Sequence, residues 1–282
     1  MLTAVVVTYS ASPSELGRCV TAIRHGGGVD RIVVIDTGGS ARIDDLPGTP
    51  PCELIRVANR GYGAAANVGF ARAAAIGADR IALLNDDVIV RPGWTEPLLA
   101  ALAEAPEVGA AQPKLIDAGT GAVNSLGVQV GRDGAGTDIG DGEPDVDQTG
   151  AEPRPIELFT GGAVLFTTGF LADTGGFDER YFLYYEDVDL ARRGAARGWR
   201  YRLAPGSAVD HARGLSTAQI PERTRFLQER NRLWAAFRFA DPGTIARAVW
   251  LSVRRLRHAP RRVHAQALIA GLRGAPRRLR ER

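Results

Sequence analysis

The sequence predicts an α/β domain with a mainly parallel central sheet flanked by helices, followed by a basic helical extension. Three observations support this prediction. Residues 2–8 form an apolar, β-branched run without alternation, which is typical of a strand buried on both faces of a parallel sheet. Strand-like runs then alternate with helix-like segments through residue 90. With 282 residues and 45% apolar composition, the chain can form one large domain with an appendage.

The predicted elements follow in a regular order. After the first strand, residues 13–23 are predicted to be a helix, because Leu16, Val20 and Ile23 recur at helical spacing and glycines at 26–28 end it. Strands are predicted at residues 31–35, 53–57 and 81–84, and a helix at residues 64–76 separates the last two. This alternation implies right-handed crossovers and a doubly wound sheet.

Polar or acidic residues follow three of these strands. Asp36 comes after the second strand, Asn59 after the third, and Asn85-Asp86-Asp87 directly after the fourth. The carboxyl ends of parallel strands form the usual ligand crevice of an open α/β sheet. Adjacent carboxylates repel each other unless a cation neutralises them, so we predict a cationic ligand here. The alternative is that one Asp only caps a turn.

The middle of the chain has a different composition. Residues 117–155 are rich in Gly, Asp and Pro, and we interpret them as a mobile surface excursion with a short strand around residues 128–130. Regular structure is expected again from residue 156, where Gly161 and Gly162 precede an apolar strand. These glycines indicate either close approach of a ligand to the backbone or a bulge in a structural strand.

The C-terminal part is strongly basic. Residues 213–282 contain 17 Arg and 4 acidic residues, a net charge of +13, whereas the whole chain carries only +3. Residues 226–237 and 245–256 each contain an apolar stripe at helical spacing, with Arg on the opposite face. This pattern favours contact with an anionic membrane surface. The stripes could also pack on the domain or bury against a second copy of the chain as a homodimer, and nucleic acid is not expected because no binding motif accompanies the charge.

Targeting features point to the cytoplasm. No stretch reads as a signal peptide, and no apolar run reaches the roughly 18 residues of a membrane span. We therefore expect a cytoplasmic protein, peripheral on the inner face of the cell membrane. Cys19 and Cys52 lack metal or redox spacing and are expected to be ordinary thiols.

A second acidic cluster lies at Glu186, Asp187 and Asp189, directly after an aromatic stretch at residues 181–185. The cluster begins a predicted helix, where carboxylates are favoured by the helix dipole and by free amide groups. The aromatic residues could wall a pocket and raise the pKa of one carboxylate, which suits a general base. Simple capping of the helix is the alternative.

Taken together, these residues resemble the inverting, metal-dependent nucleotide-sugar glycosyltransferases of family 2, whose fold is called GT-A and is Rossmann-like. The resemblance covers about residues 1–240 and is closest to the bacterial rhamnosyltransferases and galactofuranosyltransferases that build cell-wall or surface polysaccharide on a lipid carrier. It rests on five motifs in order: Val5-Val6-Val7-Thr8-Tyr9-Ser10, Val34-Ile35-Asp36-Thr37-Gly38-Gly39-Ser40, Asn59-Arg60-Gly61-Tyr62-Gly63-Ala64-Ala65-Ala66-Asn67-Val68-Gly69, Leu83-Leu84-Asn85-Asp86-Asp87, and Gly175-Gly176-Phe177-Asp178 leading to Tyr185-Glu186-Asp187-Val188-Asp189-Leu190.

The resemblance implies a nucleotide site on the first three strands. Thr8 and Asp36 would line the base pocket, with the Asp36 carboxylate accepting a base N–H. Asn67 would help to position the nucleotide, and Arg60 could contact its phosphates. The implied donor is a nucleoside-diphosphate sugar, with dTDP- or UDP-linked sugars favoured.

The resemblance also implies a metal site. Asn85-Asp86-Asp87 stands where the family has its Asp-x-Asp motif, so Asp87 would be a metal ligand, and Asn85 and Asp86 would contact the nucleotide. His211 resembles the family's later metal-coordinating histidine. The implied metal is Mg²⁺ or Mn²⁺, which would bridge a carboxylate and the diphosphate. Asn85 replaces the first carboxylate of the motif and is the departure from the family pattern.

The resemblance assigns the general base to Asp187, with Glu186 as the reserve. Gly161, Gly162 and Asp189 would shape the acceptor pocket or brace the base. The implied reaction moves a sugar, of rhamnose type or another hexose, to a glycan or polyprenyl-linked acceptor.

Two other functions fit parts of the sequence. Gly61-x-Gly63-x-x-Ala66 formally fits a dinucleotide fingerprint, which would suggest an NAD-binding oxidoreductase, but the fingerprint belongs after the first strand. A non-catalytic glycosyltransferase-like module that binds a nucleotide sugar or lipid is suggested by Asn85 in place of an acid.

Overall fold

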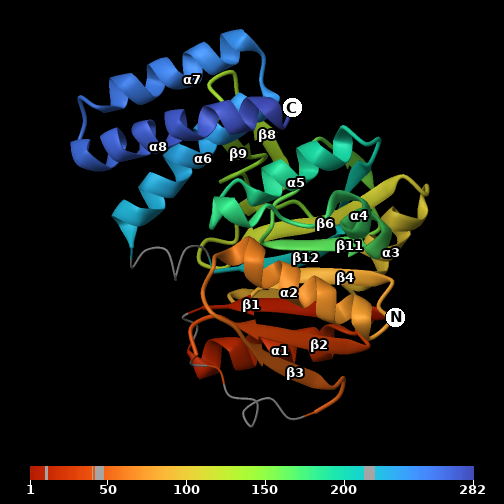
Figure 1. Cartoon of the computed structure of the whole chain (residues 1–282). Coiled ribbons are helices and arrows are strands. Elements are labelled where there is room, and N and C mark those ends of the chain that lie inside the picture. The colour runs from red at the N-terminus through yellow and green to blue at the C-terminus, as the bar shows by residue number, and fades with distance from the viewer. Residues whose placement is uncertain (10–11, 40, 42–47, 213–219) are drawn as a thin grey trace.

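The structure is a computed structural model that describes residues 1–9, 12–39, 41, 48–212 and 220–282 (Figure 1). Ser10 and Ser40, which end the first two motifs, lie outside the described residues, as does Arg213, where the C-terminal extension was predicted to begin.

A ten-stranded sheet forms the centre of the molecule, in the order β10-β12-β6-β11-β4-β1-β2-β3, with β5 paired to β12 and β7 paired to β6. The predicted parallel half is confirmed, since β4, β1, β2 and β3 are parallel neighbours. The other half is mixed, because β11 runs antiparallel to both β4 and β6. The strands are β1 (Leu2–Thr8), β2 (Arg31–Asp36), β3 (Cys52–Arg56), β4 (Arg80–Asn85), β5 (Val88–Val90), β6 (Val108–Asp117), β7 (Val123–Ser125), β10 (Arg154–Ile156), β11 (Ala163–Thr167) and β12 (Arg200–His211).

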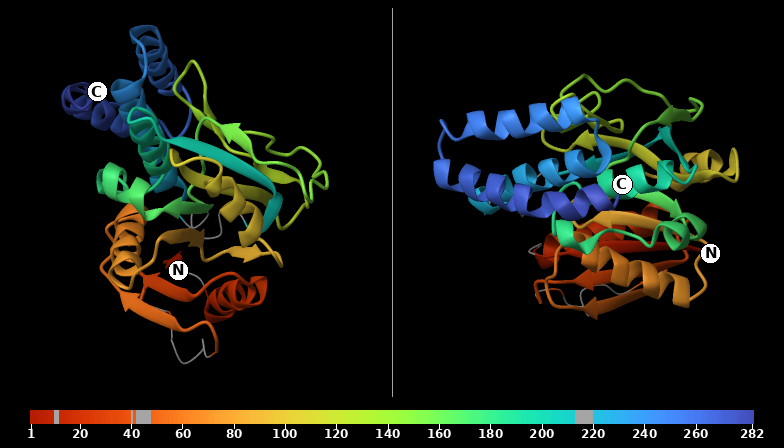
Figure 2. Two further views of the ribbon diagram at one scale, coloured as in Figure 1. Left: turned by 90° about the vertical axis from the view of Figure 1, so that its right-hand side faces the viewer. Right: turned by 45° about the horizontal axis from the view of Figure 1, so that its top comes forward.

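Helices cover both faces of the sheet, which gives three layers (Figure 2). The helices α1 (Pro13–Gly26) and α3 (Thr95–Ala103) pack on one face, and α2 (Tyr62–Ala75), α4 (Thr168–Thr174) and α5 (Glu186–Ala195) pack on the other. All seven residues of β1 are buried, as its unbroken apolar run predicts. Ser12 caps α1 together with Glu15 in a capping box, so this helix begins where the sequence predicts.

The predicted excursion at residues 117–155 is in part an ordered component of the fold. It contains β7, and a two-stranded sheet of β8 (Val128–Val130) and β9 (Gly136–Asp138), so the short strand expected near residue 128 is confirmed. The buried Lys114 of β6 donates to Asp145 at 2.6 Å and anchors the end of the segment.

Three helices form the C-terminal part: α6 (Pro221–Phe239), α7 (Pro242–Arg255) and α8 (Arg261–Arg280). They enclose an apolar cluster of their own, to which Leu233 and Phe237 of the first predicted stripe contribute. The second predicted stripe is divided, because Ile245 and Val249 pack inward whereas Val253 is exposed. In Figure 1 the three helices lie side by side at one edge of the sheet, next to α5 and the β8–β9 hairpin.

Candidate active site

A cavity of about 300 Å³ lies at the carboxyl ends of the parallel strands. Its volume suits a small-molecule ligand. The sequence predicted that the ends of neighbouring strands would meet in one crevice, and Asn59 and Asp87 do line the same cavity. Its other lining residues come from these strand ends, from the aromatic loop at 182–184 and from the start of α6, and include Val7, Tyr9, Thr37, Gly61, Tyr62, Asn85, Asp86, Phe182, Leu183, Tyr184, His211, Ile220 and Arg223.

Asp87 and His211 face each other in this cavity, with 3.2 Å between Asp87 Oδ1 and His211 Nε2. On the other side of the imidazole ring, Nδ1 lies 2.7 Å from the Oδ1 atom of Asn124. With Nδ1 donating to this amide oxygen, Nε2 is the ring nitrogen that faces Asp87. Asp87 Oδ1 is buried and accepts no hydrogen bond within the described residues. A buried carboxylate oxygen beside an imidazole nitrogen is a donor set that fits a divalent cation such as Mn²⁺.

The sheet explains why His211 and Asp87 meet although 124 residues separate them in the sequence. The short strand β5 follows Asp87 and pairs antiparallel with the end of β12, with His211 opposite Val88. Asn124 reaches the ring from β7, inside the predicted excursion. Among the described residues no group of three or more His, Cys, Asp or Glu is placed to hold a metal ion, so diphosphate oxygens and water would complete the coordination of a bound cation.

Asn85 and Asp86 complete the strand end. The Nδ2 atom of Asn85 lies 3.4 Å from His211 Nε2. Burial raises the pKa of Asp86 to about 6, although a hydrogen bond from the Thr8 hydroxyl opposes this rise, and the neighbouring charge of Asp87 adds to it. An acid at position 85 would add a third carboxylate to this pair, so the amide lowers the repulsion in the site.

The predicted base-pocket residues do not reach the cavity surface. Thr8 is buried, and its hydroxyl is engaged with Asp86, while the flanking Val7 and Tyr9 line the cavity. Asp36 is also buried, and its carboxylate accepts the backbone N–H groups of Gly38, Gly39 and Ala41. Asp36 therefore shapes the loop after β2, and Thr37 of that loop lines the cavity.

Asn67 and Arg60, which the resemblance assigns to the nucleotide and its phosphates, lie outside the lining of this cavity. Asn67 accepts the N–H of Phe177 at 2.9 Å and donates to its carbonyl at 3.0 Å, which joins α2 to the loop before α5. Arg60 pairs with Glu179 at 3.1 Å, and its side chain is 74% exposed. Neither residue lines the cavity, so any effect of Asn67 on the nucleotide would act through the loop that it holds.

Asp187 lines a second cavity, of about 460 Å³. The β8–β9 hairpin, the first turn of α5 and the facing sides of α6 and α7 enclose it, and Tyr184 lines this cavity as well as the first. The carboxylate of Asp187 accepts the N–H groups of Gly161 at 2.9 Å and Val188 at 2.8 Å. Burial raises the pKa of Asp187, and these two hydrogen bonds oppose the rise.

Glu186 has a different environment. It is buried, and its Oε2 atom has no hydrogen-bond partner within the described residues. Burial, and then the charge of Asp187, raises the pKa of Glu186 to about 8. The raised pKa favours the protonated form of Glu186, whereas two amide donors favour the ionised form of Asp187, so Asp187 is the better candidate for a carboxylate base. This geometry favours Asp187 over the reserve residue.

The adjacent glycines Gly161 and Gly162 connect the two cavities. The N–H of Gly161 binds Asp187, and its carbonyl accepts the hydroxyl of Tyr62 at 2.7 Å. The carbonyl of Gly162 accepts the N–H of Asn85 at 3.0 Å, at the strand end that carries Asp87. The turn before β11 thus bonds both to Asp187 and to the strand end that carries Asp87, and so links the two cavities.

The aromatic loop between the cavities has a strained backbone. Phe182, Tyr184 and Tyr185 all have φ near +70°, which bulky residues rarely adopt. Such conformations cost about 1–3 kcal/mol each and persist only where surrounding contacts enforce them. Gly61 makes one such contact possible: it has φ of 101°, and a Cβ atom there would lie 2.3 Å from the carbonyl oxygen of Phe182.

Asn231 of α6 holds the other side of this loop, and no motif or pattern in the sequence indicates this role. Its side chain is fully buried, and its Nδ2 group lies within 3.0 Å of the carbonyl oxygens of Tyr181, Leu183 and Tyr184. Arg230 donates to its Oδ1 at 2.8 Å and also to the carbonyl of Tyr181. The predicted C-terminal extension thus supports the site directly.

We expect Asn231→Asp to lower stability by about 2–4 kcal/mol, since it replaces a buried donor to three carbonyls with an acceptor. Turnover of the folded fraction is also expected to fall by at least about tenfold, because the loop walls both cavities. Thermal unfolding and steady-state kinetics measure the two effects. Gln266→Glu makes the same change at an exposed site on α8 and should leave both unchanged. A stable, fully active Asn231→Asp variant would contradict this role.

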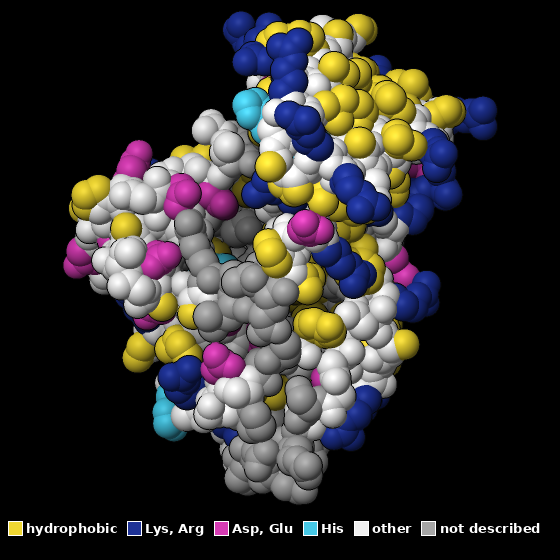
Figure 3. All heavy atoms as spheres, turned by 90° about the vertical axis from the view of Figure 1, so that its left-hand side faces the viewer, with side chains coloured by type: hydrophobic (Ala, Val, Ile, Leu, Met, Phe, Trp, Pro, Cys, Tyr) yellow, Lys and Arg dark blue, Asp and Glu magenta, His cyan; other side chains and the backbone are white. Residues whose placement is uncertain are grey.

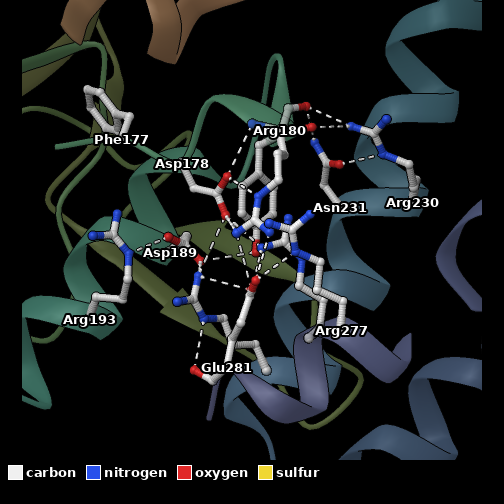
Figure 4. A network of polar contacts seen from close by, with 12 residues as sticks. Phe177, Asp178, Arg180, Asp189, Arg193, Arg230, Asn231, Arg277 and Glu281 are labelled. Atoms are coloured by element: carbon white, nitrogen blue, oxygen red, sulfur yellow. Dashed lines mark hydrogen bonds and ion pairs between the residues drawn. The ribbon is translucent and has the colours of Figure 1, made fainter. Parts of the chain in front are cut away.

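An ionic network ties α8 to the same region (Figure 4). Asp178 receives hydrogen bonds from Arg180 and from the buried Arg278, and Asp189 receives them from Arg193 and Arg238. Burial alone would raise the pKa of Asp178, but the hydrogen bonds from the two arginines hold it well below its usual range. Both carboxylate oxygens of Asp189 are thus paired with arginines, which fixes the first turn of α5 next to Asp187.

The sequence is similar to a known protein family and to characterised members of it. A family model described as "Glycosyltransferase like family 2" matches residues 2–233. The N-acetylglucosaminyl-diphospho-decaprenol L-rhamnosyltransferases of two Mycobacterium tuberculosis strains are each 30% identical to the chain over 302 aligned positions, which cover 93% of this chain and 96% of the relative.

Two solved structures share the fold. The crystal structure of GalNAc-T7 with UDP, GalNAc and Mn2+ superposes with a TM-score of 0.67 at 14% identity and covers 95% of this chain, which spans 54% of that protein. The mannosyltransferase PcManGT of Pyrobaculum calidifontis, in complex with GDP-Man and Mn2+, gives a TM-score of 0.56 at 16% identity. The superposition covers 98% of this chain and 86% of the mannosyltransferase chain.

Proposed function

The chain belongs to glycosyltransferase family 2 and has the GT-A fold, and on that premise we propose that it transfers a rhamnose-type sugar from a nucleoside-diphosphate donor to a lipid-linked glycan. It is a glycosyltransferase by family, so the oxidoreductase alternative does not apply. The proposed sugar and acceptor are suggested by the rhamnosyltransferases that are 30% identical over most of the chain. A role in cell-wall or surface polysaccharide synthesis agrees with that relationship.

One observation supports catalysis rather than binding alone. Two cavities share Tyr184, and one contains Asp86, Asp87 and His211 while the other contains Asp187. We assign the first cavity to the donor and the second to the acceptor. Inversion requires a base on the face of the sugar opposite the leaving group, and under this assignment Asp187 lies on the acceptor side.

The proposed reaction is a single displacement. Asp187 accepts the proton of an acceptor hydroxyl, and that oxygen forms a bond to the anomeric carbon. The bond from the anomeric carbon to the diphosphate oxygen breaks, and its electron pair leaves with the nucleoside diphosphate. Gly161 and Val188 hold the Asp187 carboxylate, and Tyr62 fixes Gly161 from the donor side.

Asp87 and His211 would hold a divalent cation, and the buried Asp87 oxygen, which faces His211 and accepts no hydrogen bond within the described residues, supports this assignment. A bound cation would neutralise charge on the diphosphate of the leaving group. Asn124 keeps the imidazole in the orientation that suits a ligand.

The donor assignment can be tested by measuring release of nucleoside diphosphate with Mn²⁺ and N-acetylglucosaminyl-diphospho-polyprenol as acceptor. The donors to compare are dTDP-rhamnose, UDP-galactofuranose, UDP-glucose and GDP-mannose. We expect acceptor-dependent release with dTDP-rhamnose. Binding of a donor without release for any of the four would instead support the non-catalytic module.

We further propose that α7 and α8 bind the inner face of the cell membrane. Large apolar side chains are exposed on these helices, and Figure 3 shows apolar side chains gathered at this part of the molecule with Lys and Arg around them. They are Trp250, Val253, Ile269, Leu272 and Leu279, with exposed fractions of 44–55%. Residues 242–282 contain 11 Arg and one Glu, which suits anionic headgroups. None of the helices in the described ranges is long and apolar enough to pass through a bilayer.

We expect the double variant Trp250→Ser, Val253→Ser to bind vesicles of phosphatidylglycerol at least about tenfold more weakly, since each lost apolar contact is worth about 1.5–3 kcal/mol. Cosedimentation measures this binding, and vesicles of phosphatidylcholine test the contribution of charge. Val146 is 64% exposed and lies outside α7 and α8, so Val146→Ser is the matched control. Unchanged binding of the double variant would contradict the membrane role, and a dimer that dissociates in this variant would assign the face to a second copy.

A further inference from the structure

Arg223 is the only Lys or Arg that lines the first cavity within the described part of the chain. It lies on the first turn of α6, and the strand ends that carry Asn85, Asp87 and His211 form another wall of the same cavity. Its side chain is exposed, and no carboxylate of the described residues forms an ion pair with it. A cation at the edge of an acidic cavity is placed to meet an anionic ligand.

The position of Arg223 is defined by the strained loop. Its guanidinium carbon lies 4.4 Å from the centre of the Phe182 ring, in a cation–π contact. Phe182 is held in turn, because its carbonyl accepts the N–H of Tyr62 at 2.7 Å. The backbone conformation of Phe182 therefore places its ring against the Arg223 guanidinium, which lines the cavity.

Charge balance points to what this group binds. The cavity has two carboxylates, Asp86 and Asp87, and a bound divalent cation would offset only these two charges. The diphosphate of a donor adds further negative charge, and Arg60, the predicted phosphate ligand, does not line the cavity and is paired with Glu179. Arg223 supplies the missing positive charge, and a guanidinium binds phosphate oxygens in a bidentate manner.

We propose that Arg223 binds the diphosphate of the donor and stabilises the nucleoside diphosphate as it leaves, an inference that rests on the proposed function. When the bond between the anomeric carbon and the diphosphate oxygen breaks, the electron pair stays on that oxygen. Arg223 acts on this added negative charge and takes no part in proton transfer.

The test compares binding of UDP and dTDP with binding of UMP and dTMP in MnCl₂, by isothermal titration calorimetry. In Arg223→Gln we expect the preference for the diphosphates over the monophosphates to fall by roughly 10- to 100-fold, the usual effect of losing a charged hydrogen bond. Arg223→Lys keeps the charge but loses the planar guanidinium, so its preference for diphosphates is expected to lie between those of the wild type and Arg223→Gln. Turnover with the preferred donor should fall at least as much as diphosphate binding.

Arg225→Gln is the matched control, since Arg225 is exposed on the same helix, two residues further on, and does not line the cavity. It should bind all four nucleotides like the wild type, and both variants should unfold at the wild-type temperature. An unchanged diphosphate preference in Arg223→Gln would overturn the role of Arg223 alone. A wild-type protein that binds neither UDP nor dTDP would overturn both this inference and the proposed function.

Discussion

Asp187→Asn is expected to reduce turnover by about 10²- to 10⁴-fold while leaving donor binding unchanged, because a general base contributes rate enhancement of that size. The substitution preserves the size of the side chain and removes its ability to accept a proton. Asp187 lines the second cavity and not the first, so nucleotide affinity should stay within about twofold of wild type by calorimetry. Wild-type turnover in Asp187→Asn would disprove the base assignment.

Glu186→Gln separates the two acids of this pair. Because burial and the charge of Asp187 raise the pKa of Glu186 and favour its neutral form, this variant should keep most of its activity near pH 7. Turnover of the wild type requires ionised Asp187, so it should fall as the pH decreases through the raised pKa of that group, at a higher pH than for an ordinary aspartate near 3.9. Loss of activity in Glu186→Gln, with full activity in Asp187→Asn, would exchange their roles.

Asp87→Asn is expected to weaken Mn²⁺ binding by at least about 100-fold and to reduce turnover to a similar degree, since it removes the carboxylate that faces His211. Calorimetry with MnCl₂, or electron paramagnetic resonance of free Mn²⁺, measures the affinity without turnover. Asn124→Ala, which removes the hydrogen bond to His211 Nδ1, should weaken Mn²⁺ binding by about 10- to 100-fold.

Asp210→Asn is the matched control for the metal site. Asp210 precedes His211 on β12 but pairs with Arg91 at 2.6 Å, and it does not line the cavity. Its loss should leave Mn²⁺ affinity unchanged and alter stability by less than about 1 kcal/mol, as for other exposed ion pairs. Equal metal affinity in Asp87→Asn and the wild type would rule out the proposed metal ligand.

The parallel half of the sheet could be predicted because its signal is local. An apolar run without alternation, as in β1, occurs only where a strand is covered on both faces, and the polar residues after each run locate the strand ends. The acidic groups Asp87 and Asp187 were identified in the same way, from their positions after a buried strand and at the start of a helix.

The supporting residues could not be predicted, because their roles depend on contacts between distant segments. Asn124 lies in a Gly- and Asp-rich stretch, yet β7 brings it to His211. Arg223 and Asn231 appeared only as part of a basic amphipathic helix, and one lines the donor cavity while the other holds the strained loop. Conversely, Thr8 and Asn67 belong to recognisable motifs, but their side chains bond to Asp86 and Phe177 within the protein.

The parallel strands and the acidic residues near them can be located from neighbouring residues, whose spacing sets the buried face and the strand end. The family, and the departure at Asn85, follow from the resemblance of five ordered motifs. Which groups meet depends on the tertiary structure: antiparallel pairing of β5 with β12 brings His211 to Asp87, and the turn at Gly161-Gly162 joins Asp187 to the strand end at Asn85. Pairing across the sheet depends on the packing of the whole chain, and no local pattern encodes it.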